Sequence, residues 1–135
     1  QYEKIDEFIK IRRKNFFILK NLLSDLSKYF ILPKETPGSK PSWFGFPITI
    51  KKSSNINREK FLEYLETKKI GTRLLFGGNI IHQPYMLNKN YRVAGTLKVS
   101  DTIMKQSFWI GVYPGLKKRN LEYISKVFHD YFENN

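Results

Sequence analysis

The sequence contains no cysteine, only half as many acidic as basic side chains, and no long apolar run. Without Cys, the chain itself cannot supply disulfides, thiolate zinc sites, iron–sulfur ligands or a Cys nucleophile. Its apolar runs extend for a few residues, far short of the roughly 18–20 that a membrane-spanning helix needs. Residues 1–14 are charged and lack the apolar core of a signal peptide. We therefore expect neither membrane insertion nor secretion from these features.

Aromatic residues are, by contrast, abundant. They make up 16% of the 135 residues, and hydrophobic residues as a whole make up 41%. A disordered chain is poor in such residues, so this composition excludes disorder despite the high charge. The length and the apolar content together are sufficient for one packed domain.

The positive charge is concentrated in the middle of the chain. The formal net charge is +12, of which residues 51–100 contribute +7, residues 1–50 contribute +4 and residues 101–135 contribute +1. A stand-alone basic module that binds nucleic acid is therefore one alternative. However, no zinc-finger spacing and no aromatic–basic ribonucleoprotein motif is found, and Lys mostly occupies polar positions of helical patterns. We expect solvated faces and no nucleic-acid partner.

The first segment has the periodicity of a long amphipathic helix. Apolar side chains recur at spacings of three and four at Ile5, Phe8, Ile9, Phe16, Leu19, Leu22, Leu23 and Leu26. No Gly or Pro interrupts this pattern, which is long for so small a domain and typical of a helix that bridges two domains. We assign residues 1–31 to a connector helix. Because the sequence begins within a helical pattern and without Met, we expect it to be part of a longer protein.

Residues 32–135 predict a small α+β domain. Pro33, Pro37, Gly38 and Pro41 make residues 32–42 a loop. Strands are expected at residues 43–51, 72–76 and 107–113, and helices at 57–69, 101–106 and from 116 onwards. Asn57 is the expected N-cap of one helix and Gly71 its left-handed end, while Pro47 suggests an edge strand or a bulge. The order predicts one small, mostly antiparallel sheet of three strands packed by helices.

One segment has the features of an anion-binding loop. Gly77, Gly78 and Asn79 follow a short strand that carries Arg73, and a guanidinium near a Gly-rich turn is well placed to bind an anion. The loop fits neither a Walker motif nor a Rossmann fingerprint, so a simple flexible turn remains the alternative. His82 has no carboxylate or Ser partner nearby in sequence, and His129 lies in the last helix among Val127, Phe128 and Asp130. We expect structural or surface roles for both.

Several sequence blocks together resemble a family of vitamin B6-dependent sugar enzymes. The blocks are residues 41–48 (PSWFGFPI), 71–79 (GTRLLFGGN), 83–85 (QPY), 91–93 (YRV) and 108–116 (FWIGVYPGL). In this order they are similar to the CDP-4-keto-6-deoxyglucose 3-dehydrase family of lipopolysaccharide biosynthesis. That family belongs to the sugar aminotransferase-like superfamily, whose members have the aspartate aminotransferase fold. The resemblance covers residues 32–132.

The resemblance implies that this chain is the C-terminal small domain of a bacterial cytoplasmic enzyme. The large domain, expected upstream, would hold the PMP or PLP cofactor and, in CDP-sugar members, an iron–sulfur cluster, so no cofactor or metal is expected on this chain. The implied reaction removes the C3 hydroxyl of a CDP-linked 4-keto-6-deoxyhexose on the way to a 3,6-dideoxyhexose of O-antigen. The implied parent is a homodimer that works with a reductase, and the isolated chain is expected to be inactive.

The resemblance also places the anion-binding loop at the substrate. Arg73, Phe76, Gly78 and Asn79 would face the cleft and bind or orient the nucleotide sugar, and no residue of this chain is expected to be catalytic. His82 stands where close members are expected to carry Arg, which departs from the pattern. A PLP-dependent sugar aminotransferase remains the alternative, distinguished by a Lys instead of a His in the large domain.

Overall fold

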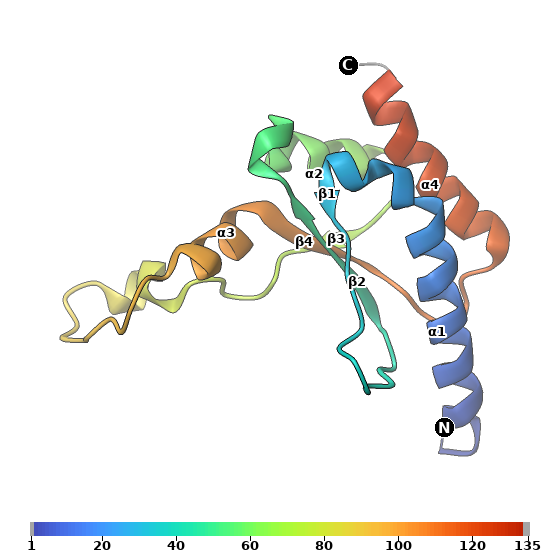
Figure 1. Cartoon of the computed structure of the whole chain (residues 1–135), viewed down its shortest axis with the longest axis horizontal. Coiled ribbons are helices and arrows are strands. Elements are labelled where there is room, and N and C mark those ends of the chain that lie inside the picture. Colours follow the sequence, from blue (N-terminus) through green and yellow to red (C-terminus); the bar gives the residue numbers. More distant parts are fainter. Residues whose placement is uncertain (1, 134–135) are drawn as a thin grey trace.

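The computed structural model describes residues 2–133 as one antiparallel sheet with helices packed against it (Figure 1). The sheet has four strands in the order β1-β2-β4-β3, formed by Phe30–Ile31, Gly45–Ile50, Ser107–Gly111 and Thr72–Arg73. The small antiparallel sheet is therefore confirmed, but its predicted strand number of three is corrected to four. The additional strand, β1, has only two residues, which is too short for the two-residue alternation of a strand to show in the sequence.

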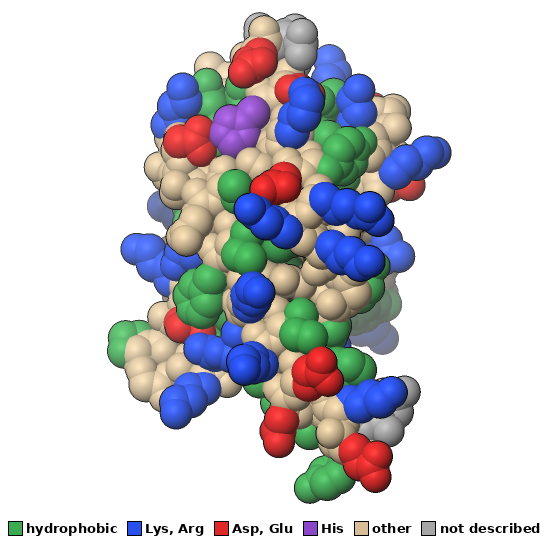
Figure 2. All heavy atoms as spheres, turned by 90° about the vertical axis from the view of Figure 1, so that its right-hand side faces the viewer, with side chains coloured by type: hydrophobic (Ala, Val, Ile, Leu, Met, Phe, Trp, Pro, Cys, Tyr) green, Lys and Arg blue, Asp and Glu red, His purple; other side chains and the backbone are tan. Residues whose placement is uncertain are grey.

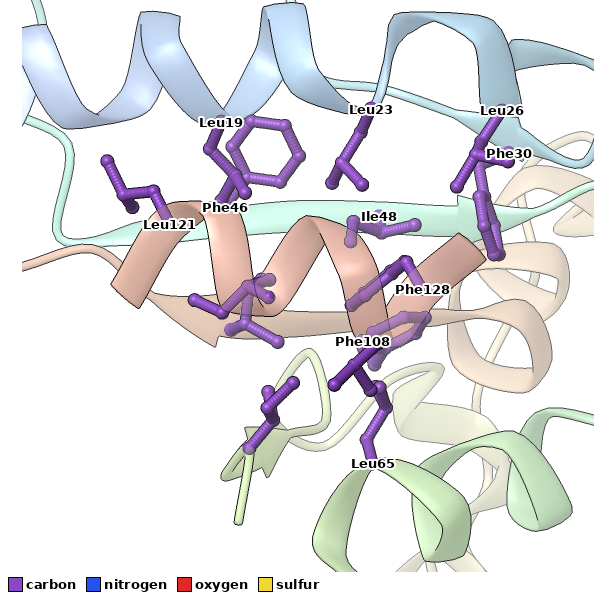
Figure 3. Close-up of a cluster of buried hydrophobic side chains, with 14 of the residues drawn as sticks. Leu19, Leu23, Leu26, Phe30, Phe46, Ile48, Leu65, Phe108, Leu121 and Phe128 are labelled. Atoms are coloured by element: carbon purple, nitrogen blue, oxygen red, sulfur yellow. The ribbon is translucent and has the colours of Figure 1, made fainter. Parts of the chain in front are cut away.

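Helices α1 (Ile5–Leu22) and α4 (Lys118–Glu133) contact each other and cover one face of the sheet (Figure 1). Figure 3 shows Leu19 and Leu23 of the first segment pointing toward Phe46 and Ile48 of β2. Along β2, Phe46, Ile48 and Ile50 are buried while the residues between them are half-buried. This alternation gives the sheet a core face under the helices and a second face on the opposite side.

The regular N-terminal helix is shorter than the sequence pattern suggests. α1 ends at Leu22 and a 3-10 turn, Ser24–Lys28, leads directly into β1. Ser24 Oγ donates a hydrogen bond of 2.8 Å to the carbonyl of Asn21, which an α-helix would pair with the amide of residue 25. The helix expected over residues 1–31 is therefore corrected to Ile5–Leu22, although Leu26 itself remains buried in the core.

Two local features also differ from their predictions. β2 has neighbours on both sides and is not the edge strand that Pro47 suggested. However, β1 pairs only with Thr49 and Ile50, so Pro47 has a strand partner only in β4. The missing N–H of Pro47 therefore leaves no hydrogen bond unmade on the β1 side. Helix α2 (Arg58–Thr67) is capped by Asn57 as predicted, since Asn57 Oδ1 accepts from the amide of Lys60. Its left-handed end residue is Lys69, with φ of 61°, rather than Gly71.

An irregular excursion separates β3 from β4 and extends away from α1 and α4 (Figure 1). It contains 3-10 turns at Ile80–His82 and Pro84–Met86 and ends in α3 (Lys98–Gln106), which contacts β2 and β4. α3 begins at Lys98, so the predicted cap at Ser100 or Asp101 is wrong and both residues lie inside the helix. Among residues 2–133, no helix has the length and apolar character to cross a membrane.

Candidate functional site

An apolar groove lies beside the second face of the sheet. It has a volume of about 380 Å³ and its walls include Trp43, Phe44, Pro47, Phe76 and Trp109. Trp43 stacks on Phe16 of α1 with ring centroids 4.0 Å apart, which fixes one wall to the core. The volume lies within the range of small-molecule sites, and the aromatic rings can stack on a flat or apolar ligand. Aromatic residues expected mainly in the core thus also line a surface groove.

Loop residues 32–44, which lead into the groove, are held by α1. Arg13 Nη1 donates to the carbonyl of Pro41 at 3.0 Å, and Arg13 Nη2 forms a 3.0 Å ion pair with Glu35. A planar guanidinium can make both contacts at once. The first helix therefore positions the entrance to β2, and with it one side of the groove.

Arg73 lies on the same face of the sheet as the groove. It pairs with Trp109 across β3 and β4, and Trp109 pairs in turn with Pro47 of β2. Partners in an antiparallel pair present their side chains to one face, so these three residues form a row opposite the core. The Arg73 side chain is exposed, donates to the carbonyl of Thr72 at 2.8 Å, and forms no ion pair with a carboxylate within residues 2–133. It remains able to bind an anion.

The loop after Arg73 contains two residues in the left-handed region. Phe76 has φ of 48° and Gly78 has φ of 64°. Phe76 is 79% exposed and contributes to the groove wall. A bulky residue in this conformation is strained by about 1–3 kcal/mol, and such strain clusters at functional sites. Phe76, three residues after Arg73, therefore combines a strained backbone with a highly exposed aromatic ring.

The other two predicted site residues contact α3. Gly78 lies so close to Met104 that an added Cβ would come within 2.5 Å of the Met104 Cγ. Asn79 is only 3% exposed; its side chain accepts from the amide of Ile81 at 3.4 Å and donates to Asp101 at 2.7 Å. Phe76 thus lines the groove and Arg73 lies on the same face of the sheet opposite Trp109, whereas Gly78 and Asn79 attach the loop to α3.

Asp101 is a hydrogen-bond partner of Asn79 and His82 that the sequence alone did not reveal. Its Oδ1 accepts from Asn79 and also lies 2.8 Å from His82 Nε2. The hydrogen bond from Asn79 and then that from His82 lower the pKa of Asp101 below its ordinary value, because both stabilise the carboxylate. Positions 79, 82 and 101 are too distant in sequence for their contact to be predicted from spacing. The expected structural role of His82 fits this geometry.

The surface over α1 and α4 is basic but mixed. Figure 2 shows Lys and Arg side chains spread over the face of α1 and α4, with acidic and hydrophobic side chains between them. Such a distribution is typical of a solvated helical surface rather than a continuous nucleic-acid track. No group of three or more His, Asp or Glu that could hold a metal ion occurs among residues 2–133.

Comparison with characterised proteins shows close sequence relatives over nearly the whole chain. The chain is 48% identical over 132 residues to the lipopolysaccharide biosynthesis protein RfbH of Salmonella typhimurium, covering 98% of this chain and 30% of that protein. It is 44% identical over 124 residues to the dTDP-4-dehydro-2,6-dideoxy-D-glucose 3-dehydratase of Saccharopolyspora spinosa, covering 92% of this chain and 27% of the relative. The chain therefore spans about a third or less of these relatives.

Solved structures show the same fold. A GDP-4-keto-6-deoxy-D-mannose-3-dehydratase of E. coli, solved with bound hydrated PLP, matches with a TM-score of 0.84 and 27% identity over 94% of this chain and 32% of the other. The family model described as the DegT/DnrJ/EryC1/StrS aminotransferase family matches residues 1–129. The chain thus belongs to the DegT/DnrJ/EryC1/StrS aminotransferase family and corresponds to a fragment of a PLP sugar aminotransferase-like protein.

Proposed function

We propose that this chain is the substrate-facing small domain of a PMP- or PLP-dependent nucleotide-sugar 3-dehydrase. The main support for this proposal is the 48% identity, over almost the whole chain, to a lipopolysaccharide biosynthesis protein, together with 44% identity to a sugar 3-dehydratase. The substrate is a nucleotide-linked 4-keto-6-deoxyhexose, with CDP as the proposed nucleotide, and the product leads to a 3,6-dideoxyhexose of lipopolysaccharide. The complete enzyme is a cytoplasmic homodimer in this proposal.

The role of this chain is to bind and orient the sugar nucleotide. The Arg73 guanidinium donates to a phosphate or sugar oxygen, since its planar fork can contact two oxygens at once. Phe76 and the aromatic groove offer an apolar surface to the less polar part of the ligand. Gly78 and Asn79 contribute by fixing the shape of the loop against α3. No residue of this chain acts as the catalytic acid or base.

The cofactor belongs to the portion of the parent outside this sequence. When bound, PMP or PLP supplies the electron-withdrawing ring that makes loss of the sugar hydroxyl possible. The absence of Cys means that an iron–sulfur cluster would take no Cys ligand from this chain. Replacing a C–OH bond by C–H consumes two electrons and two protons and releases water, so a reductase is the proposed partner.

The full-length protein that carries this chain provides the test. Purified enzyme with PMP is incubated with CDP-, dTDP- and GDP-linked 4-keto-6-deoxyhexoses, with and without a reductase, and the sugar products are analysed by mass spectrometry. Loss of the C3 oxygen, most rapid with the CDP sugar, is expected. Replacement of the keto oxygen by an amino group, dependent on an added amino donor, would instead identify the sugar aminotransferase that the family name also allows.

A second observation separates these two activities before any assay. The dehydrase requires a His at the position where aminotransferases carry the Lys that forms a Schiff base with the cofactor. Sequencing the large domain of the parent and replacing that residue tests the assignment. A Lys at this position, with a stable PLP absorbance that borohydride fixes to the protein, would overturn the dehydrase proposal.

A further inference from the structure

The loop beside Arg73 and helix α3 are joined by a shared carboxylate. Asp101 Oδ1 accepts from Asn79 Nδ2 at 2.7 Å and lies 2.8 Å from His82 Nε2. Asn79 is 3% exposed, so its amide has little access to water and depends on these internal contacts. One side chain of α3 therefore holds both ends of the short turn from Asn79 to His82.

A second contact on the same face of α3 fixes the loop by shape. Gly78 lies against the side chain of Met104, three residues after Asp101 and thus on the same side of the helix. The close approach leaves no room for a side chain at position 78. The Asp101 carboxylate therefore holds Asn79, and the Met104 side chain packs against the preceding residue, Gly78.

Helix α3 is itself anchored at its other end. Arg58, the first residue of α2, donates through Nη1 to the carbonyl of Met104 and, at 3.4 Å, to the carbonyl of Ser107. A cation at the C-terminal end of a helix stabilises the unpaired carbonyls there. The position of α3 is thereby tied to α2 and β4, so α3 is a fixed support for the loop.

We propose that Asp101 is a positioning residue of the substrate site. This inference rests on the proposed function: by holding Asn79 and His82, Asp101 sets the left-handed turn that includes Phe76 and Gly78, and through it the orientation of the exposed Phe76 ring beside Arg73. Phe76, a bulky residue in the left-handed region, is strained and keeps this conformation only when its surroundings fix it. Asp101 supplies that constraint without touching the substrate.

The first test measures loop order in the full-length protein without substrate. Hydrogen–deuterium exchange at residues 77–83 is compared in the wild type, Asp101→Ala, Asn79→Ala and the double variant. Each single change should speed exchange there about tenfold, the scale of one lost hydrogen bond, and the double variant should add little to either. Glu122→Ala, which removes another helix carboxylate from the exposed Lys118–Glu122 pair, is the matched control and should leave this segment unchanged.

Two outcomes of this test would overturn the proposal. Unchanged exchange in Asp101→Ala would show that the carboxylate does not hold the loop. Fully additive effects of Asp101→Ala and Asn79→Ala would show that Asp101 acts only on the N-terminal end of α3, as any acidic residue in a first helical turn can. Asp101→Asn keeps an oxygen acceptor in the same place, so it should preserve most of the protection even if Asp101→Ala unfolds α3.

The second test uses kinetics with the sugar nucleotide that the wild type accepts. Asp101→Ala should raise KM about tenfold with kcat changed about twofold or less, because the loop binds substrate but performs no chemistry. Asp101→Asn should restore most of the wild-type KM. Altered exchange with an unchanged KM would overturn the positioning role. A wild type that turns over no sugar nucleotide would instead contradict the proposed function, while the exchange experiment would still decide whether Asp101 holds the loop.

Discussion

Arg73 lies directly opposite Trp109 in the antiparallel pair of β3 and β4, so its cationic side chain and the indole occupy the same face of the sheet. Trp109 lines the apolar groove, whereas Arg73 remains exposed and unpaired with any carboxylate in residues 2–133. A cation beside an aromatic groove is suited to a ligand that has both anionic and apolar parts. A nucleotide sugar is such a ligand.

Arg73→Lys should impair substrate use while leaving the fold intact. Lys keeps the charge but loses the planar fork, so kcat/KM of the full-length enzyme should fall by about tenfold to a hundredfold. The melting temperature should stay nearly constant because the side chain is exposed and bonds only to the adjacent Thr72 carbonyl. Unchanged kinetics together with a lowered melting temperature would instead make Arg73 a structural residue and the loop only a turn.

Gly45→Ala should disturb the groove by displacing Trp109, one of its wall residues. An added Cβ would approach Trp109 Cε3 to 2.6 Å, so the indole has to move out of its place. We expect a loss of about 1–3 kcal/mol in the free energy of unfolding, the usual cost of overpacking. A shift in Trp emission should accompany it. Gly111→Ala is the control, because no atom lies within 4 Å of an added Cβ at that position. Equal behaviour of the two variants would contradict the tight packing of Trp109 on Gly45.

Asn15→Ala should weaken the attachment of α1 to the rest of the domain. Asn15 is buried, and its Nδ2 donates to the carbonyls of Tyr113 and Leu116 at 3.2 and 3.1 Å, in the turn before α4. Removing the amide leaves two carbonyls without this donor, which should cost about 1–3 kcal/mol of unfolding free energy in denaturant titration. Asn21→Ala, on the exposed side of the same helix, should change stability far less.

His129 and Asp25 should make stability depend on pH. His129 Nε2 lies 2.8 Å from Asp25 Oδ2, and its Nδ1 lies 2.7 Å from the carbonyl of Ser125. Burial by itself lowers the pKa of His129, but the hydrogen bonds to Ser125 and Asp25 outweigh it and raise the pKa above 6.5. The hydrogen bond from His129 lowers the pKa of Asp25 below 3.8. Both neighbouring acceptors thus favour the doubly protonated ring.

The sign of the effect follows from these two shifts. The raised pKa of His129 contributes stability that is complete below pH 6.5 and is lost as pH rises through the folded-state pKa. The lowered pKa of Asp25 contributes stability above pH 3.8 and loses it as pH falls. Asp25→Asn should therefore lower the melting temperature more at pH 5 than at pH 8. A difference independent of pH would contradict the pair, and Glu122→Gln serves as the control.

Local sequence determined the elements whose signals are short-range. The three- and four-residue periodicity identified the buried stripe of α4, including Leu121, Ile124 and Phe128, because a helix places such positions on one side. The Asn57 side chain could be assigned as a cap from its position alone, since it binds an amide only three residues away. Sequence blocks likewise indicated the family, which the match over residues 1–129 confirmed.

Only the tertiary structure decided the features that depend on distant contacts. β1 exists because Phe30 and Ile31 meet Ile50 and Thr49, and a two-residue strand carries no signal of its own. Asn79 was recognised within an unusual loop, but its partner Asp101 lies 22 positions away on a helix whose path sequence spacing does not define. The sequence therefore indicated candidate ligand-binding residues, whereas the packing of α3 against the loop decided which of them hold the loop in place.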